Sequence, residues 1–305
     1  MTTFKAEIPF RAYWSTPFCK WQSEFQHLHA IEFASYVTRQ ELGLRGLNTA
    51  HFDYAVLGLT IPQPQCFYGT PWMTSMAGLG EISGPTIAQA CATGVRSLAT
   101  AVSEIELDMA NTALVVTADR TSNGAHIYYP APSAMGGTGV HENWVLDNFS
   151  RDPAGGNSMT QTAENVAAKY NIDTGAQHDV VLRRYEQYQD ALANDHAFQK
   201  RYMRLPFDVP RPRLDKIVGQ IDGDVGVTPV SGEGLTALKP VMPNGTVTFA
   251  AQTHPADGSA SMVICKAEEA KQLSADPNVR IRILGFGQAR VEQALMPDAV
   301  IPAAP

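Results

Sequence analysis

Cys91 is the residue of this sequence that is best placed to act as a nucleophile. It lies where an extended segment, residues 84–90, passes into a helical pattern that begins near Ala92. At such a junction, free backbone N–H groups and the positive end of the helix dipole would converge on the sulfur. Both favour the thiolate, which is the nucleophilic form of cysteine. Small residues on either side would let a substrate approach: Ala90, Ala92, Thr93 and Gly94.

The alternative interpretation of Cys91 is a buried structural cysteine, which is what most free cysteines are. Position alone does not separate the two interpretations. Gln89-Ala90-Cys91 is similar to the caspase signature, but the next residues, Ala92-Thr93, depart from it. The four cysteines, at 19, 66, 91 and 265, have no metal-ligand or Cys-x-x-Cys spacing, so we expect neither a metal site nor a redox pair.

The segments around Cys91 predict a strand–helix–strand unit. Residues 52–58 read as a short buried strand, and 84–90 as a second extended segment. A compact apolar strand is predicted over 113–118. Between them, apolar residues follow the i, i+3, i+4 spacing of an amphipathic helix: Val95, Leu98, Ala99, Val102, Ile105 and Met109. A strand, a helix and a strand within about 35 residues imply a parallel sheet.

The composition changes after this unit. Residues 120–157 are rich in Gly, Pro, Asn, Tyr and Trp, which predicts a long irregular region. Two helices are predicted next, over 162–170 and 177–194. Each is preceded by residues spaced like a capping box: Ser158 with Gln161, and Thr174 with Gln177.

A basic cluster follows at residues 200–216, with six cationic side chains: Lys200, Arg201, Arg204, Arg211, Arg213 and Lys216. It is either an anion-binding segment or a solvated charged loop that Asp208 and Asp215 partly neutralise. Three more strands are predicted over 245–250, 261–265 and 280–285. This order predicts an α/β fold, in which an inserted loop-and-helix domain interrupts the core.

Composition narrows the class of protein. The 305 residues carry 23 Lys+Arg and 30 Asp+Glu, so the net charge is −7, and only 17% of residues are charged. A surface this poor in charge suggests that another subunit covers part of it. The acidic balance argues against binding to nucleic acid or to an anionic membrane. No apolar run reaches the length of a membrane span, and no signal peptide is recognisable, so a cytoplasmic protein with free thiols is expected.

Four segments resemble motifs of the thiolase family, in the family's order and across nearly the whole chain. Gln89-Ala-Cys-Ala-Thr-Gly-Val-Arg-Ser-Leu98 is similar to the stretch around the family's acyl-acceptor cysteine. Met159-Thr-Gln-Thr-Ala-Glu-Asn-Val-Ala167 resembles its Met-Gly-x-Thr-Ala-Glu-Asn-Val-Ala segment. The other two matches are Gly245-Thr-Val-Thr with Thr253-His-Pro-Ala-Asp-Gly-Ser-Ala260, and Met296-Pro-Asp-Ala-Val-Ile-Pro-Ala-Ala304.

The resemblance implies an acyl-CoA C-acyltransferase in which Cys91 takes the acyl group. Coenzyme A thioesters would be substrates, with no tightly bound cofactor. Met159 falls where the family has a Met beside the pantetheine arm, and Thr253 where it has a Ser that contacts the pantetheine amides. In the basic cluster, Arg211 or Arg213 would bind the phosphates of CoA.

The resemblance also implies domain boundaries. Residues 1–119 and 250–275 would form the family's N-terminal domain, in a layered α/β/α core. Residues 120–249 would be the inserted CoA-binding loop domain, and 276–305 the start of a C-terminal domain that is largely missing. A homodimer, a homotetramer or a partner chain carrying that half is expected.

Departures from the family pattern leave alternatives open. Ser158 stands where a His is common, and Ala118-Asp-Arg-Thr-Ser-Asn123 replaces Gly-Gly-x-Glu-Ser-Met. The family's general-base His and second Cys, in Gly-His-Pro and Cys-x-Gly segments, have no counterpart here, and the loop histidines 126, 141 and 254 are poor substitutes. The alternatives are therefore a non-catalytic CoA-binding or assembly subunit that needs a partner, or a thiolase-like aldolase or condensing enzyme.

Overall fold

The computed structural model describes residues 4–304, and the chain divides into two compact units. Unit 1 comprises Met1–Asn123, Gln199–Gly226 and Pro255–Gly285. Unit 2 comprises Gly124–Phe198, Val227–His254 and Phe286–Pro305. The predicted insertion, 120–249, overlaps unit 2 without coinciding with it, because residues 199–226 pack in unit 1. The buried side chain of Phe207 joins the core of that unit.

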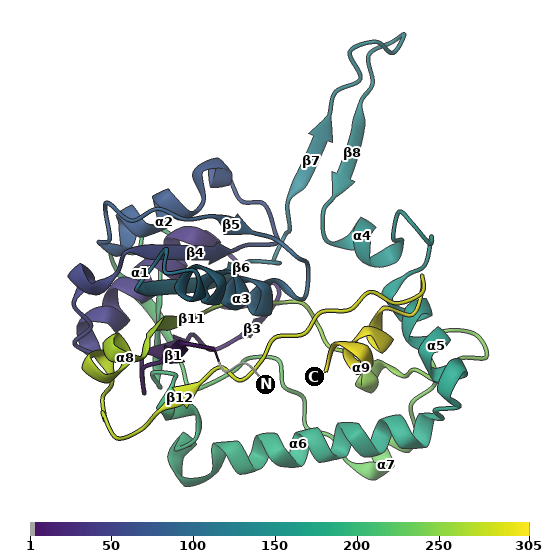
Figure 1. The fold of residues 1–305 in the computed structure, drawn as a ribbon. Coiled ribbons are helices and arrows are strands. Elements are labelled where there is room, and N and C mark those ends of the chain that lie inside the picture. Colours follow the sequence, from purple (N-terminus) through teal and green to yellow (C-terminus); the bar gives the residue numbers. More distant parts are fainter. Residues whose placement is uncertain (1–3, 305) are drawn as a thin grey trace. The chain divides into compact units, whose positions relative to one another are not determined.

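Unit 1 is built on a mixed eight-stranded sheet, which confirms the predicted α/β class (Figure 1). Its order is β12-β1-β11-β6-β4-β5, with β2 and β3 also paired to β11. β4, β5 and β6 are parallel, as the strand–helix–strand pattern predicts, whereas β11 runs antiparallel to β6. The strands are β1 (Ala6–Ile8), β2 (Tyr13–Ser15), β3 (Cys19–Lys20), β4 (Tyr54–Gly58), β5 (Thr86–Ile87), β6 (Thr112–Asp119), β11 (Ala256–Lys266) and β12 (Ile281–Arg282).

Helices cover both faces of this sheet. α1 (Ala30–Leu44) and α2 (Thr70–Ala77) share one core cluster with Leu57 and Leu114, and α3 (Thr93–Glu106) shares another with Val56 and Val115. Successive strand residues point to opposite faces, so a strand covered on both faces is apolar throughout. This explains why β4 and β6 are continuous apolar runs. Unit 1 also contains α8 (Ala267–Leu273) and a separate hairpin of β9 (Phe207–Pro210) and β10 (Ile217–Ile221).

Two glycines allow the segments around Cys91 to pack closely. A Cβ on Gly58 would lie 2.8 Å from Ser97 Oγ, so α3 approaches the end of β4 more closely than a side chain would allow. A Cβ on Gly84, whose φ is +157°, would lie 1.7 Å from the carbonyl oxygen of Ala55. β5 therefore lies against β4 only because residue 84 is a glycine.

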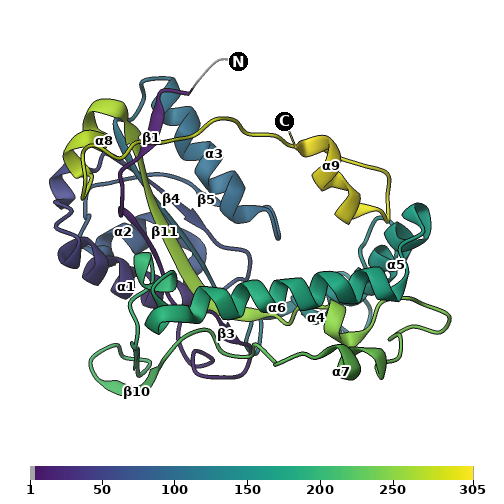
Figure 2. The ribbon, with the colours of Figure 1, turned by 90° about the horizontal axis from the view of Figure 1, so that it is seen from below.

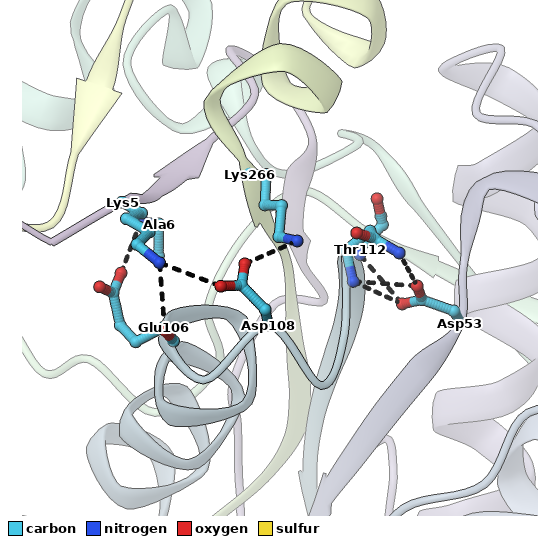
Figure 3. Close-up of polar contacts among 8 residues, drawn as sticks. Lys5, Ala6, Asp53, Glu106, Asp108, Thr112 and Lys266 are labelled. Atoms are coloured by element: carbon cyan, nitrogen blue, oxygen red, sulfur yellow. Dashed lines mark hydrogen bonds and ion pairs between the residues drawn. The ribbon is translucent and has the colours of Figure 1, made fainter.

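Polar contacts hold the end of the sheet where β4 and β6 begin, which is opposite the end from which the chain leads to Cys91 (Figure 3). The Asp53 carboxylate accepts hydrogen bonds from the backbone N–H groups of Asn111 and Thr112. Asp108, just after α3, forms ion pairs with Lys5 at 3.2 Å and Lys266 at 2.8 Å. These contacts join the start of the chain, the end of α3 and the end of β11 around one point.

Unit 2 is mainly helical, with one antiparallel hairpin of β7 (His126–Tyr129) and β8 (Val140–Asn143). Figure 2 shows its long helix, α6, with α5 near one end. The helices are α4 (Leu146–Ser150), α5 (Met159–Tyr170), α6 (Thr174–His196), α7 (Gly232–Thr236) and α9 (Val300–Ala303). The backbone of α6 is non-helical at Ala193, Asn194 and Asp195.

The structure corrects three local predictions. Ser158 caps α5 by accepting from Gln161 N–H, as predicted, but the Gln161 side chain bonds Asn165 and does not complete the box. α6 is capped by Asp173, one residue before the predicted Thr174. Residues 245–250 form no strand; the 3₁₀ turn η4 (Phe249–Ala251) begins there. Within residues 4–304, no helix is long and apolar enough to cross a membrane.

Candidate functional site at Cys91

Cys91 is the one exposed cysteine among the four. It lies between β5 and α3, at the junction that the sequence pattern predicts. Cys19 and Cys265 are buried, and burial raises the pKa of the Cys19 thiol well above its usual range and that of Cys265 to about 12. Cys66 is half-buried. Of the four thiols, the structure leaves Cys91 most open to a reagent.

The turn before Cys91 has an unusual backbone that Thr93 holds in place. Ala90 has φ of +44°, which non-glycine residues seldom adopt. The buried Thr93 hydroxyl donates to the Ala90 carbonyl at 2.7 Å and accepts from Gln89 N–H at 2.7 Å. Two hydrogen bonds from one side chain therefore fix the turn on which Cys91 is presented.

The start of α3 supplies backbone donors close to this turn. The helix begins at Thr93, whose N–H bonds the Ala90 carbonyl at 3.1 Å. In the described residues, the N–H groups of Gly94 and Val95 have no hydrogen-bond acceptor outside the helix. Such first-turn N–H groups can stabilise negative charge.

A partly buried carboxylate, that of Asp119, holds the loop beside the turn. Leu59, after β4, donates its N–H to the Ile87 carbonyl of β5 at 3.0 Å. The next two N–H groups, of Thr60 and Ile61, donate to Asp119 Oδ1 at 2.9 and 2.8 Å. Burial raises the pKa of Asp119, although these hydrogen bonds oppose the rise. In the sequence, Asp119 stands out only as part of a departure from the family motif. Its position, a charged residue directly after the apolar run 113–118, is the signal that points to a structural role.

Asp257 plays a similar part for the segment after β6. Its buried carboxylate accepts from Thr121 N–H at 2.7 Å and from Ser122 N–H at 2.9 Å, and also from both hydroxyls. It therefore ties the Asp-Gly motif of β11 to residues 120–123, which directly follow β6. This end of β6 is level with the end of β5, after which Cys91 follows.

No general base contacts Cys91 in the part of the chain that the structure describes, since its sulfur has no hydrogen bond or ion pair there. His126, His141 and His254 belong to unit 2. His126 Nδ1 lies 3.2 Å from His141 Nε2, across the β7–β8 hairpin. Unit 1 therefore offers an exposed thiol and backbone donors, and among residues 4–304 no proton acceptor contacts the sulfur.

Met159 and Thr253 both lie in unit 2. Met159 is the first residue of α5 and is 37% exposed. It lines a cavity of about 340 Å³ together with Asp152, Thr162 and residues between 289 and 299. Thr253 is exposed, and its hydroxyl donates to the His254 carbonyl at 3.4 Å.

Glu164 joins two of the sequence motifs in unit 2. Its carboxylate accepts from Thr246 N–H at 2.9 Å and from Val247 N–H at 2.8 Å. Partial burial raises the pKa of Glu164, but these hydrogen bonds outweigh burial and lower it overall. A Cβ on Gly245 would overlap Glu164 Oε1, so a larger residue there would push the carboxylate away from the N–H groups that it binds. The Gly245-Thr-Val-Thr motif is thus bound by a helix rather than paired in a sheet.

A third motif packs against the same helix. Asp298 accepts from Lys169 Nζ at 2.6 Å and from the Tyr170 hydroxyl at 2.6 Å. The Asn165 amide donates to the Ala294 carbonyl at 3.1 Å. α5 is therefore the element around which the motifs of unit 2 assemble.

Arg211 and Arg213 lie in unit 1, in the turn between β9 and β10. Both oxygens of Asp215 accept from Arg211 at 2.6 Å, so this arginine is already paired. Arg213 is exposed, and no ion pair to it is found among residues 4–304. The basic cluster is not one patch, because Lys200 and Arg204 line a different cavity, beside α1.

Comparison with known proteins agrees with this architecture. Residues 12–268 match the family profile described as "Thiolase, N-terminal domain". An acetyl-CoA acetyltransferase of Allochromatium vinosum is 26% identical over 280 residues, which cover 90% of this chain and 69% of that protein. A beta-ketoadipyl-CoA thiolase of Pseudomonas putida is 29% identical over 246 residues, covering 75% of this chain and 57% of that protein.

Solved structures share the fold. The human mitochondrial 3-ketoacyl-CoA thiolase in complex with CoA superposes with a TM-score of 0.83 at 20% identity. The match covers 99% of this chain and 76% of the human one. The Bacillus anthracis acetyl-CoA acetyltransferase gives a TM-score of 0.81 at 21% identity, covering 97% and 74%. The chain thus spans between about half and three quarters of the length of these proteins.

Proposed function

The chain belongs to the thiolase family of acyltransferases, and on that premise we propose that it forms an acyl-thioester on Cys91 in a thiolase-type acyl-CoA C-acyltransferase. The observation that carries the proposal is the setting of Cys91. It is an exposed thiol on a turn fixed by Thr93, directly before a helix in which the N–H groups of Gly94 and Val95 have no acceptor outside the helix among residues 4–304. Its position in the Gln89–Leu98 motif supports the same role.

The chemistry is an exchange of thioesters. The Cys91 thiolate attacks the carbonyl carbon of an acyl-CoA, a new S–C bond forms, and the CoA thiolate leaves and takes up a proton. The N–H groups at the start of α3 would stabilise the oxyanion that forms during this attack. The acyl group then passes to the enolate carbon of acetyl-CoA, or returns to the CoA thiol in the cleavage direction.

For CoA binding we propose Met159 and Thr253 in unit 2, with the arginines of the β9–β10 turn. Coenzyme A enters as a substrate thioester, which is the kind of ligand that the names of the relatives indicate for those proteins. Arg213 is the stronger candidate for a phosphate, because Arg211 is engaged by Asp215. The Met159 side chain, exposed beside a cavity, would contact the pantetheine arm.

Acetylation of the intact protein tests the nucleophile. After incubation with acetyl-CoA, mass spectrometry of the whole chain and of its peptides should find one acetyl group, on the peptide that contains Cys91. Cys91→Ala should abolish this label. Cys66→Ala is the matched control, because Cys66 is the next most accessible thiol, and it should leave the label unchanged. Label on another cysteine, or none on Cys91, would overturn the proposal.

A second function is favoured by one observation, the lack of a base at Cys91 in the described residues. Condensation requires proton abstraction from acetyl-CoA, so a chain that has only the nucleophile could be acylated without forming a C–C bond. It would then act as a CoA-binding or assembly subunit beside a partner that supplies the base. Acetylation of Cys91 together with no formation of acetoacetyl-CoA would support this second function; product formation by the chain alone would exclude it.

A further inference from the structure

Unit 1 contains a cationic cavity that the proposed reaction does not use. It has a volume of about 480 Å³, within the range of small-molecule sites, and lies beside the end of α1. Four cationic side chains line it: Arg11, Arg45, Lys200 and Arg204. Glu41 is the one acidic residue in the lining, so the cavity carries three more positive than negative charges, although the chain as a whole carries −7.

A buried carboxylate orients two of these arginines. Glu41 is 6% exposed, and its Oε2 accepts from Arg45 Nε at 3.0 Å. Glu41 Oε1 lies 3.9 Å from Arg204 Nε. The same two guanidinium groups also donate to neutral oxygens, Arg45 to the Arg11 carbonyl at 2.7 Å and Arg204 to Gln40 Oε1 at 2.6 Å. Arginines fixed in this way are ready to bind an anion with little loss of side-chain entropy.

Arg11 supplies a third cation that is still available. Its guanidinium lies 5.6 Å from the ring centre of Phe10, and it forms no hydrogen bond or ion pair within residues 4–304. Its backbone φ is +65°, a conformation that the surrounding structure must impose. The cavity also has an apolar wall, to which Phe10, Leu47 and Met203 contribute.

The cavity is distinct from the Cys91 turn. Ala12, next to Arg11, accepts from Val263 N–H, and Val263 pairs with Leu114 near the start of β6. Cys91 follows β5, whose Ile87 lies in register with Gly58 and Thr117, near the end of β6. Arg11 thus lies near β11, whereas Cys91 follows the edge strand β5, three strands away. The two residues also lie toward opposite ends of β6.

We propose that this cavity binds a small amphipathic phosphate, with Arg11, Arg45 and Arg204 around the phosphate and the apolar wall around the rest of the ligand. Guanidinium groups match the geometry of phosphate oxygens and bind them bidentately. The end of α1 places the negative end of a helix dipole nearby, but its half charge is small beside the four cations. The site goes beyond the proposed acyl transfer and does not depend on it.

Calorimetric titration with hexyl phosphate tests the site, with inorganic phosphate and hexanol as probes for each half of the ligand. The wild-type chain should bind hexyl phosphate more tightly than either probe, and less tightly as NaCl is raised. Arg11→Gln and Arg204→Gln should each weaken binding about tenfold. Arg282→Gln, which removes an exposed cation outside the cavity, should have no effect.

Two measurements keep the test decisive. Circular dichroism establishes that each variant is folded, and having two arginine variants guards against loss of one of them to misfolding. Arg11→Gln should still be acetylated at Cys91, and Cys91→Ala should still bind hexyl phosphate, so failure of one proposal is distinguishable from failure of the other. Absence of binding by the wild-type chain, or wild-type affinity in both arginine variants, would overturn the proposed site.

Discussion

At the scale of single residues, two carboxylates hold the loops beside the Cys91 turn, the partly buried Asp119 and the buried Asp257. Asp119 binds the N–H groups that follow β4, and Asp257 binds those that follow β6. Each carboxylate satisfies backbone donors that a turn in the chain leaves without partners, and an unsatisfied buried donor is costly. Both residues support the turn through the backbone rather than through contact with the sulfur.

Asp119→Asn should preserve the fold and change its pH dependence. Burial raises the pKa of Asp119 above its ordinary value near 3.8, so its contribution to stability is present below that value and is lost as the pH rises through the folded-state pKa. Asn can keep the oxygen that accepts from Thr60 and Ile61 and has no charge to bury. The free energy of unfolding of the variant, relative to wild type, should therefore increase between pH 4 and pH 7, as chemical denaturation measures.

Asp119→Ala provides the contrast for this experiment. It removes the acceptor and leaves two backbone donors unpaired in a buried place, at a cost of roughly 2–3 kcal/mol. Equal losses of stability in the Asn and Ala variants would show that the charge of Asp119, rather than its acceptor oxygen, holds the loop.

At the scale of elements, α5 organises unit 2 and β5 presents Cys91. α5 binds the Gly245-Thr-Val-Thr segment through Glu164 and the Met296-Pro-Asp segment through Lys169 and Tyr170. β5 is short and lies at the edge of the sheet. Its position depends on the close approach of residues 83–87 to β4.

Glu164→Gln should loosen the contact between α5 and residues 245–248. Oε2 becomes an NH₂ group that can no longer accept from the Thr246 N–H and hydroxyl, although Oε1 still accepts from Thr246 and Val247. The variant should therefore lose about 1–2 kcal/mol of unfolding free energy near neutral pH. Because the pKa of Glu164 is lowered in the folded state, its contribution is lost as the pH falls below its ordinary value of 4.5. The difference in unfolding free energy between variant and wild type should accordingly become smaller in acid. A difference that stays constant with pH would contradict the role of the ionised Glu164 carboxylate as the acceptor.

Gly84→Ala should displace β5 and reduce acylation of Cys91. The added methyl group would overlap the Ala55 carbonyl, and φ of +157° is unfavourable for alanine, so we expect a loss of about 2 kcal/mol or more. Gly43→Ala is the matched control, because nothing lies within 4 Å of its Cβ position in α1; it should gain about 0.5–1 kcal/mol. Thermal unfolding and acetyl labelling of Cys91 measure both effects. Full labelling of the Gly84 variant would count against the role of β5.

At the scale of the whole molecule, we propose that a partner covers part of the surface of the chain. Charged residues make up 17% of the sequence. Large apolar side chains are exposed in unit 1, among them Phe67 at 91%, Tyr68 at 71% and Val95 at 58%. Val95 lies one turn after Cys91, on α3, so a partner that covers Val95 would also shield the Cys91 thiol from water.

Sedimentation velocity should therefore give a mass above the 33.0 kDa of one chain. A homodimer or a homotetramer is the proposed assembly, and Val95→Glu should shift it toward the monomer, because a charge would have to be buried in the contact. Val180→Glu is the control, since Val180 is 57% exposed on α6 and has no place in the proposed contact. If the wild-type chain sediments as a monomer at all concentrations, self-association is contradicted. A partner with a different sequence would then be the remaining interpretation of the exposed apolar side chains.

Much of the core could be predicted because its pattern is local. The apolar run of β6 and the helical spacing after Ala92 predicted a parallel strand–helix–strand unit over residues 84–118. β5, α3 and β6 form it, and β4 lies between the two strands in the sheet. Residues 245–250 have the composition of a strand, but Glu164 binds their N–H groups instead. Capping of α6 shifted by one residue because Asp173 is a stronger acceptor than Thr174.

The α/β class, the position of Cys91 before a helix and the likeness to a family could be predicted from the sequence, since periodicity, composition and motif order depend on neighbours along the chain. Which segments meet in space could be read only from the folded chain. Of the basic residues in 200–216, Arg211, Arg213 and Lys216 lie in the β9–β10 turn, whereas Lys200 and Arg204 line the cavity beside α1. That cavity is completed by Arg11 and Arg45, far away in sequence. The physical reason is that burial and pairing of charges depend on distances across the fold, which local spacing does not encode.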